Sequence, residues 1–467
     1  MRLFENLAGF GSNPALLVGQ AATISYTELT TQADEIAAAV DHRSLVFCLA
    51  SNSSESVIGY VGLQRAGHVC MMLSASIDEL KLRELVVRFK PNFVWAPANR
   101  DDAGLGMRVG RHGTYELFRT ANHVPQMSDD LAVLMATSGS TGSPMMVRQT
   151  SKNLVSNASS IIESLQLKSD DRALTTLPMN YTYGLSIINS QLQCGGSLIM
   201  SDASVMDRAF WSCALDCGAT YFGGVPYTYE MLARLGIKRF KGSTVRMLTQ
   251  AGGRLAPEIV LKMHSECKEI GVDFVVMYGQ TEATARMSIL PSESVPAKPS
   301  SIGRPIPGGS FRVIDPESGR EMGIGETGEL EYSGPNVTLG YAENALDLSK
   351  GDEFGGRLLT GDLARFDEDG DFFIVGRRKR FVKLFGNRIS LDHVENHIRE
   401  SGFENACTGV DDRLTVHVLD AGHADAVLNI VQKLVAVHRS AIVVRTTQKI
   451  PRSESGKILY SELEGQL

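Results

Sequence analysis

The chain has 467 residues, 43% of them hydrophobic, and a formal net charge of −7. This length favours two or more domains, and the negative charge argues against nucleic acid as the main partner, because phosphate neutralisation needs clustered Lys and Arg. The start of the chain lacks a signal-peptide pattern, and no apolar run reaches the roughly eighteen residues that a membrane span requires. We therefore expect a globular cytoplasmic protein with no membrane span.

The first part of the chain alternates short β-rich runs with helical patterns. Residues 44–50, 67–73 and 92–97 are predicted strands. The patterns at 54–67 and 79–89 predict helices between them. This alternation is typical of βαβ units around a largely parallel sheet.

A second set of elements follows residue 150. The sequence predicts a helix at 151–167 and strands at 172–179, 195–201, 219–226, 246–253 and 273–279. The last two strands run apolar residues into glycine, and α/β sheets place ligands at strand ends of this kind.

The character of the sequence changes twice in its last third. Turn-rich segments with short alternating strands begin near Ser301 and predict a β-rich subdomain. From Lys379 a helix–strand–helix–strand pattern predicts a small α+β domain. The predicted fold class is therefore α/β, with a large N-terminal domain of stacked α/β subdomains plus the β-rich subdomain (1–378) and a small mobile α+β C-terminal domain (379–467).

A loop rich in hydroxyls and glycine lies between two of these elements. It reads Thr137, Ser138, Gly139, Ser140, Thr141 and Gly142. Glycines let backbone N–H groups converge on an anion and hydroxyls add donors, so the loop suits phosphate oxygens, with a triphosphate as the natural ligand. It matches neither a Walker A loop nor a GxSxG or GxGxxG turn. On composition alone, an ordinary Ser- and Gly-rich loop is an equally good explanation.

This loop and six further motifs occur in the order found in one known superfamily. The motifs are TSGSTGSP at 137–144, YGQTE at 278–282, GRPIPG at 303–308, GELEYSGPNVTLGY at 328–341, TGDL at 360–363, GRRKRFVKLFGNRIS at 376–390 and PRSESGK at 451–457. Together they resemble the core motifs of the adenylate-forming (AMP-binding) enzymes, which comprise acyl- and aryl-CoA synthetases, nonribosomal peptide adenylation domains and luciferases. The resemblance implies an AMP-forming acid–thiol ligase.

Such a ligase works in two steps. A small carboxylic acid attacks the α-phosphate of ATP to give an acyl-adenylate and pyrophosphate, and a thiol then takes the acyl group. The resemblance implies ATP and Mg²⁺ as cofactors. The implied acceptor is CoA or the phosphopantetheine of a free-standing acyl carrier protein.

The resemblance also assigns roles to individual residues. Lys457 would bridge carboxylate and phosphate oxygens, Glu282 would bind Mg²⁺ through its hard carboxylate oxygens, and Thr281 would contact the α-phosphate. The other implied nucleotide contacts are Gly252, Gly253, Tyr278, Gly279, Asp362 and Arg377. Tyr278 would lie against adenine, and the Asp362 carboxylate would accept hydrogen bonds from the ribose hydroxyls.

A hinge is implied at Lys379. The C-terminal domain would rotate there between the two steps, since Lys457 must be in place for the first step and withdrawn for the second. In the rotated state the segment around Gly386 would approach the thiol acceptor. Residues 377–388 hold six basic residues and no acid, which fits either a solvated turn or a surface for the phosphates of CoA or an acidic carrier protein.

The implied acyl pocket contains Tyr181, Thr182, Tyr183, Gly184 and Tyr227. Amino-acid-activating relatives hold the substrate ammonium with an aspartate. Thr182 stands at the matching position, or Asn180 if the register shifts by two. A buried ammonium without that carboxylate would be costly, which favours a non-amino acid, and the tyrosines favour an aryl or short acyl group.

Met145 departs from the family pattern SGTTGxPK, in which a lysine meets the leaving pyrophosphate. A thioether cannot replace an ammonium, although the neighbouring Arg148 or Lys152 could do this work. Two alternatives to the ligase therefore stay open. One is a catalytically weakened homologue that binds adenylate or recruits a partner, and the other is a stand-alone amino-acid adenylation enzyme.

Overall fold

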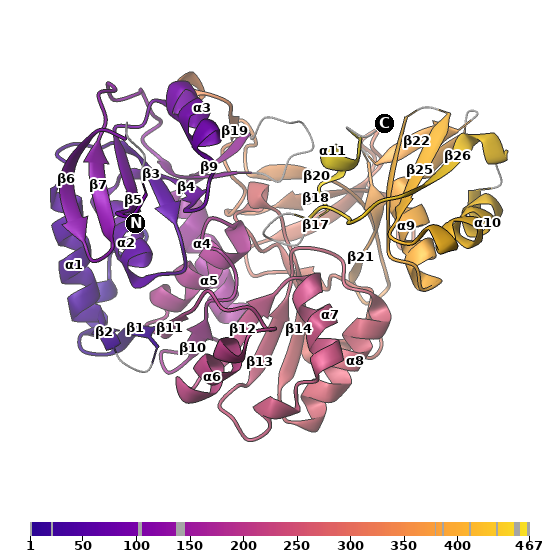
Figure 1. Cartoon of the computed structure of the whole chain (residues 1–467), viewed down its shortest axis with the longest axis horizontal. Coiled ribbons are helices and arrows are strands. Elements are labelled where there is room, and N and C mark those ends of the chain that lie inside the picture. Colours follow the sequence, from indigo (N-terminus) through magenta and orange to yellow (C-terminus); the bar gives the residue numbers. More distant parts are fainter. Residues whose placement is uncertain are drawn as a thin grey trace. The chain divides into compact units, whose positions relative to one another are not determined.

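A computed structural model (Figure 1) describes residues 2–19, 22–100, 105–136, 145–378, 380–384, 387–410, 412–435, 438–452 and 458–464. In its described parts the chain forms two compact units. The first comprises Met1–Ser138, Pro144–Ser310 and Ser333–Leu358, and the second comprises Phe311–Tyr332 and Leu359–Leu467. The sequence predicted a domain boundary between residues 378 and 379, about which the C-terminal domain would rotate. The division into compact units does not test a rotation, so this boundary stays a prediction.

The first unit contains an eight-stranded sheet in the order β19-β9-β8-β4-β3-β5-β7-β6. Its strands are β3 (Leu45–Ala50), β4 (Val69–Ser74), β5 (Phe93–Pro97), β6 (Met107–His112), β7 (Tyr115–Arg119), β8 (Leu131–Ala136), β9 (Met146–Thr150) and β19 (Tyr341–Ala342). The central four, β8-β4-β3-β5, are parallel. Helices α2 (Ser54–Ala66) and α3 (Glu79–Phe89) connect β3 to β4 and β4 to β5, as the sequence predicted.

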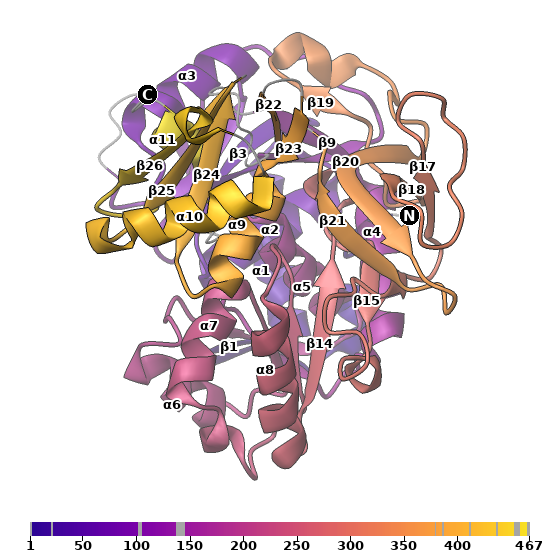
Figure 2. The same cartoon turned by 90° about the vertical axis from the view of Figure 1, so that its right-hand side faces the viewer.

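A nine-stranded sheet completes the first unit, in the order β16-β15-β14-β13-β12-β10-β11-β1-β2. Its strands are β1 (Pro14–Val18), β2 (Ala22–Ser25), β10 (Arg172–Leu174), β11 (Ser197–Met200), β12 (Tyr221–Gly224), β13 (Met247–Gln250), β14 (Asp273–Tyr278), β15 (Ser288–Leu290) and β16 (Arg304–Pro305). The helices of this region are α1 (Tyr26–Ala38), α4 (Ser151–Leu165), α5 (Thr182–Gln193), α6 (Arg208–Asp216), α7 (Pro226–Leu235) and α8 (Pro257–Glu269). Helices α7 and α8 lie beside β14 in both views (Figure 1, Figure 2).

Three hydrophobic clusters hold these layers together. The largest joins the two sheets through α1, α2, α4 and α5, with Leu16 from one sheet and Val46 from the other. A second covers the opposite face of the nine-stranded sheet under α6, α7 and α8, and a third lies under α3. The strands of the parallel core are buried on both faces, which explains why runs such as Leu45–Ala50 are continuously apolar. The α/β class expected from the sequence is confirmed.

The second unit holds almost all of a four-stranded sheet and the C-terminal elements. The four-stranded sheet comprises β17 (Ser310–Ile314), β18 (Gly328–Ser333), β20 (Arg357–Phe366) and β21 (Phe372–Arg377). The remaining elements are β22 (Phe381–Leu384), β23 (Asn387–Ser390), α9 (Leu391–Glu400), β24 (Asn405–Val410), β25 (Arg413–Val418), α10 (Ala424–Val435), β26 (Ile442–Thr446) and α11 (Tyr460–Glu464). Their apolar core includes Val394, Val416 and Val427. No helix within the described ranges is both long and apolar enough to cross a membrane.

His68 lies just before β4 and is a buried titratable group, with 4% of its surface exposed. The backbone N–H of Ser44 donates to its Nδ1 at 3.3 Å, which favours the neutral ring. Burial, assisted by the nearby charges of His42, Arg43 and Arg2, lowers the pKa of His68 to about 4.

Acid should therefore destabilise the fold through His68. In the unfolded chain His68 takes up a proton near pH 6.5, and in the folded chain only near pH 4. The contribution of neutral His68 to the free energy of unfolding is therefore fully present above pH 6.5 and is lost as the pH falls towards 4. Between pH 7 and pH 5 we expect the wild-type free energy of unfolding to fall by about 2 kcal/mol more than that of His68→Gln. Urea unfolding at both pH values measures this. The exposed His123→Gln should follow the wild type, and parallel curves for all three proteins would contradict the prediction.

Candidate functional site

The candidate site is built around the turn that follows β14. Gly279 begins this turn, and a Cβ on it would lie 1.5 Å from the carbonyl oxygen of Ala285, so only glycine fits there. Ala285 has a φ of 106°, a conformation that side chains seldom adopt. The N–H of Met287 donates to the carbonyl of Tyr278 at 2.9 Å and closes the turn. A constrained backbone thus presents the residues between Gly279 and Ala285.

Thr281 and Glu282 lie in a 3₁₀ turn, Thr281–Ala283, within this segment. The Glu282 Oε1 atom accepts a hydrogen bond of 2.8 Å from the Tyr341 hydroxyl. Within the described ranges no cationic side chain forms an ion pair with Glu282. Burial first, and then the adjacent Glu282 charge, raise the pKa of Tyr341, so its hydroxyl stays protonated and donates. The carboxylate is oriented by a neutral group and keeps its capacity for a cation.

Thr281 also meets the first residue of α5. Its hydroxyl oxygen lies 3.0 Å from that of Thr182, so one of the two donates to the other. The Gln149 side-chain amide donates to the Thr281 carbonyl at 3.3 Å. The structure therefore brings a residue predicted to contact phosphate together with one predicted for the acyl pocket.

The predicted acyl-pocket tyrosines differ in their environments. The buried Tyr183 hydroxyl donates to the Thr249 carbonyl at 2.9 Å, and Gly184 lets α5 approach the Pro178 carbonyl, which a Cβ would meet at 2.3 Å. Tyr227, on α7, is 46% exposed. Tyr183 is thus buried and held by a hydrogen bond in the first turn of α5, whereas almost half of the surface of Tyr227 is exposed to solvent.

Gly252 and Gly253 follow β13, next to these tyrosines. Gly252 has a φ of 86°, and the Tyr181 hydroxyl lies 2.5 Å from where a Cβ would be, so a larger residue fails on both grounds. A Cβ on Gly253 would lie 3.1 Å from Pro226. The sequence predicted that these glycines let a ligand come close to the backbone. In the structure, protein side chains also lie close to them.

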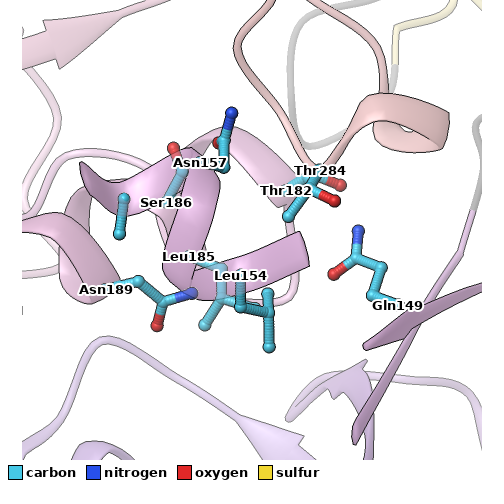
Figure 3. Close-up of a pocket in the computed structure, with 9 residues that line it drawn as sticks. Gln149, Leu154, Asn157, Thr182, Leu185, Ser186, Asn189 and Thr284 are labelled. Carbon is cyan, nitrogen blue, oxygen red and sulfur yellow. The ribbon is translucent and has the colours of Figure 1, made fainter. Parts of the chain in front are cut away.

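A small cavity lies beside Thr182, between β9, α4 and α5 (Figure 3). Its volume is about 10 Å³, and it is lined by Gln149, Leu154, Asn157, Ala158, Thr182, Leu185, Ser186, Asn189 and Thr284. A space of this size holds about one water molecule. The buried Oε1 atom of Gln149 has no hydrogen-bond partner within the described part of the chain, which suits a bound water.

In the second unit, Asp362 and Arg377 face each other across β20 and β21, whose register pairs the two residues. Arg377 Nε donates to Asp362 Oδ1 at 3.1 Å. The Asp362 side chain is 4% exposed and the Arg377 side chain 60%. The two residues predicted to contact a ribose therefore adjoin each other on one sheet.

Arg148 does not replace the cation that Met145 lacks. Its side chain is fully buried, and it donates to the carbonyl oxygens of residues 339, 341, 350 and 351 and to the Glu353 carboxylate at 2.6 Å. These acceptors occupy its guanidinium, so the suggestion that Arg148 contacts a phosphate is wrong. Lys152, in the first turn of α4, is exposed.

Several predicted residues lie outside the described part of the chain. They are Thr137, Ser138, Gly139, Ser140, Thr141, Gly142, Lys379, Gly386 and Lys457. Sequence reasoning also missed three residues that the structure brings to the site: Tyr341, Gln149 and Arg286. The signal for Arg286 was that it is the one charged residue in the sequence from Ala283 to Leu290, whose other residues are small or apolar.

Comparison with known proteins agrees with this geometry. The chain matches the family model for "AMP-binding enzyme" over residues 3–342. The indoleacetate–CoA ligase of Aromatoleum aromaticum is 29% identical over 476 residues, with 93% of this chain and 91% of that protein covered. The 2-succinylbenzoate–CoA ligase of Bacillus licheniformis is 32% identical over 294 residues, which span 61% of this chain and 58% of that protein.

Solved structures share the fold. ATP-bound MatB from Rhodopseudomonas palustris superposes with a TM-score of 0.78 at 24% identity, with 100% of this chain and 99% of that chain covered. At this level of identity the likeness concerns the fold alone. It confirms the architecture predicted from the sequence.

Proposed function

The chain belongs to the AMP-binding enzyme family, and from that premise we propose that it activates a small carboxylic acid with ATP and transfers the acyl group to a thiol. The observation that carries the proposal is the 3.0 Å contact between the hydroxyls of Thr281 and Thr182. It joins the segment proposed to hold the phosphates to the helix that begins the proposed acyl pocket, and this is where the acid and the α-phosphate must meet.

In the first step, a carboxylate oxygen of the acid attacks the α-phosphorus of ATP and the bond to pyrophosphate breaks. Two anions approach each other, so the residues there must supply donors and positive charge where charge accumulates. We assign the α-phosphate contact to Thr281, whose position the backbone of the β14 turn fixes. Lys457, Lys379 and Gly386 keep the roles that the resemblance implies, as predictions.

Glu282 is the proposed Mg²⁺ ligand. Its carboxylate fits a hard divalent cation, because the residue is partly exposed and its one hydrogen-bond partner among the described residues is the neutral Tyr341 hydroxyl. The cation would neutralise phosphate charge. Tyr341 would orient the carboxylate.

In the second step, a thiol attacks the acyl carbon and AMP leaves. We propose CoA as the acceptor, because the full-length relative reported above is named a CoA ligase. A carrier protein is the alternative. The acid is proposed to lack an α-amino group, since Tyr181, Thr182 and Tyr183 offer no carboxylate to an ammonium at the start of α5.

A catalytically weakened, adenylate-binding homologue is the second candidate function. Met145 favours it, because Arg148, the nearest described cation along the chain, is committed to other acceptors. The acid–thiol ligase remains our proposal because the Glu282 and Asp362 carboxylates are both present and oriented.

A carboxylate-dependent exchange between ATP and pyrophosphate tests the proposal. The purified chain is assayed with Mg²⁺ across a panel of aryl, short-chain and amino acids, and ATP binding is measured separately. We expect exchange with one class of non-amino acid. ATP binding without exchange for any acid would favour the weakened homologue.

Tyr341→Phe tests the orientation of Glu282. The substitution removes the hydroxyl that donates to the carboxylate and keeps the ring that packs against Phe354. We expect the Mg²⁺ concentration for half-maximal exchange to rise about tenfold, with the KM for the acid unchanged. An equal rise in both constants would point to a general loss of structure and contradict the assignment.

A further inference from the structure

Arg286 is a buried arginine in the turn between β14 and β15. Its side chain is 2% exposed, although arginine is rarely buried without a partner. The backbone around it is fixed, because the side-chain amides of Asn157 and Asn336 donate to its carbonyl oxygen at 2.9 and 3.0 Å. The guanidinium therefore occupies its buried position as part of the fold.

The described residues around Arg286 offer no counter-charge. Within the described ranges no acid forms an ion pair with it, and its Nε and Nη1 atoms are buried without a hydrogen-bond acceptor. Its electrostatic neighbours are the hydroxyls of Tyr183, Tyr221 and Tyr181. Burial lowers the pKa of Arg286 and raises the pKa of Tyr183 and Tyr221, so the tyrosines are neutral while arginine retains its proton.

The aromatic contact does not replace an acceptor. The guanidinium carbon lies 4.5 Å from the centre of the Tyr183 ring. Such a contact satisfies the face of the guanidinium. The N–H donors lie in its plane. The Tyr183 hydroxyl, which donates to Thr249, is also close enough to accept a hydrogen bond from Arg286, but Nε and Nη1 still have no acceptor among the described residues.

Three other arginines that are buried or partly buried have acidic partners. Arg148 has the Glu353 carboxylate and four carbonyl oxygens, and Arg246 is bonded to Asp171. Arg380, in the second unit, contacts Asp392 and Glu395. Arg286 is the exception among the described buried arginines, which indicates that its acceptor arrives with a ligand.

We propose that Arg286 binds a second carboxylate on the acid substrate, so that the enzyme selects dicarboxylic acids. Tyr183, against which the guanidinium stacks, adjoins Thr182, whose hydroxyl meets Thr281. A carboxylate could accept hydrogen bonds from the unpartnered Nε and Nη1 donors of the guanidinium. An acid with an apolar end would leave the charge unpaired, and an ammonium would be repelled. This inference rests on the proposed function and names its substrate class.

The test compares acids matched in length that end in a methyl group or in a carboxylate. For the wild type we expect kcat/KM in ATP–pyrophosphate exchange to be about a hundredfold higher for the dicarboxylic member. Arg286→Met should remove this preference while retaining exchange with the methyl-ended acids, and Arg286→Lys should keep part of it. Arg208→Met, at an exposed position on α6, is the matched control and should behave as wild type.

Binding provides a second readout. Dicarboxylic acids should raise the melting temperature of the wild type and of Arg208→Met, and should not raise that of Arg286→Met. A wild-type preference for methyl-ended acids, or an equal loss for both classes in Arg286→Met, would overturn the proposal in favour of a structural role. If no acid supports exchange, the proposed function fails, and the melting temperatures alone show whether Arg286 binds a dicarboxylic acid. If Arg286→Met does not fold, the acid preferences of Arg286→Lys and of the wild type test the proposal instead.

Discussion

We expect Glu282→Gln to lower the rate of ATP–pyrophosphate exchange at saturating acid by about a thousandfold, because Glu282 is the proposed Mg²⁺ ligand and the substitution would remove several kcal/mol of stabilisation by the metal ion. Glutamine keeps the shape of the side chain, and its carbonyl oxygen can still accept the Tyr341 hydrogen bond. What it loses is the negative charge that a divalent cation requires. The fold should be unaffected, because Glu282 is half-buried and makes no ion pair within the described residues.

The measurement is the exchange rate at saturating acid over a Mg²⁺ titration. Glu293→Gln, on an exposed turn of the same unit, removes an equal charge and should leave the rate unchanged. A Glu282→Gln protein with wild-type Mg²⁺ dependence would show that the metal ion is held elsewhere.

We expect Arg148→Met to lower the free energy of unfolding of the first unit by about 4 kcal/mol, because a fully buried guanidinium that holds a carboxylate and several carbonyl oxygens is removed. Methionine fills much of the space but donates no hydrogen bond. Four carbonyl oxygens between residues 339 and 351 then lose a donor, and the Glu353 carboxylate loses its partner.

Tryptophan fluorescence isolates this effect. The chain has two tryptophans, Trp95 and Trp211, and both are buried in the first unit. Urea unfolding followed by their emission therefore reports on that unit. Arg83→Met, which breaks an exposed ion pair with Glu79, should change the free energy by less than about 0.5 kcal/mol. Equal effects for the two substitutions would refute the role of Arg148.

Local pattern predicted many elements of the first unit. Residues 79–89 form α3 with the predicted bounds, because their apolar residues repeat at helical spacing. Runs such as 44–50 and 273–279 form largely buried strands of the two mixed sheets, each with a parallel neighbour. The family was predicted from seven ordered motifs, each with its own spacing, and the family match confirms it.

The interaction partners of charged residues could not be predicted from the sequence. Arg148 lies in a strand, and its acceptors come from a segment about 200 residues later, so its neighbours along the chain indicated nothing of its role. That no described residue supplies a counter-charge to Arg286 is likewise a property of the packed core. Burial of a charge depends on long-range contacts that a local pattern does not contain.

Strand β9 connects the segments proposed to bind pyrophosphate and Mg²⁺. The strand begins at Met146, just after the loop predicted to bind pyrophosphate, and pairs with Tyr341 through Val147. Arg148 Nε donates to the Tyr341 carbonyl, and the Tyr341 hydroxyl donates to Glu282. A shift of β9 would thus turn the Glu282 carboxylate. We expect pyrophosphate and Mg²⁺ to strengthen each other's binding by the same factor, since such coupling is reciprocal.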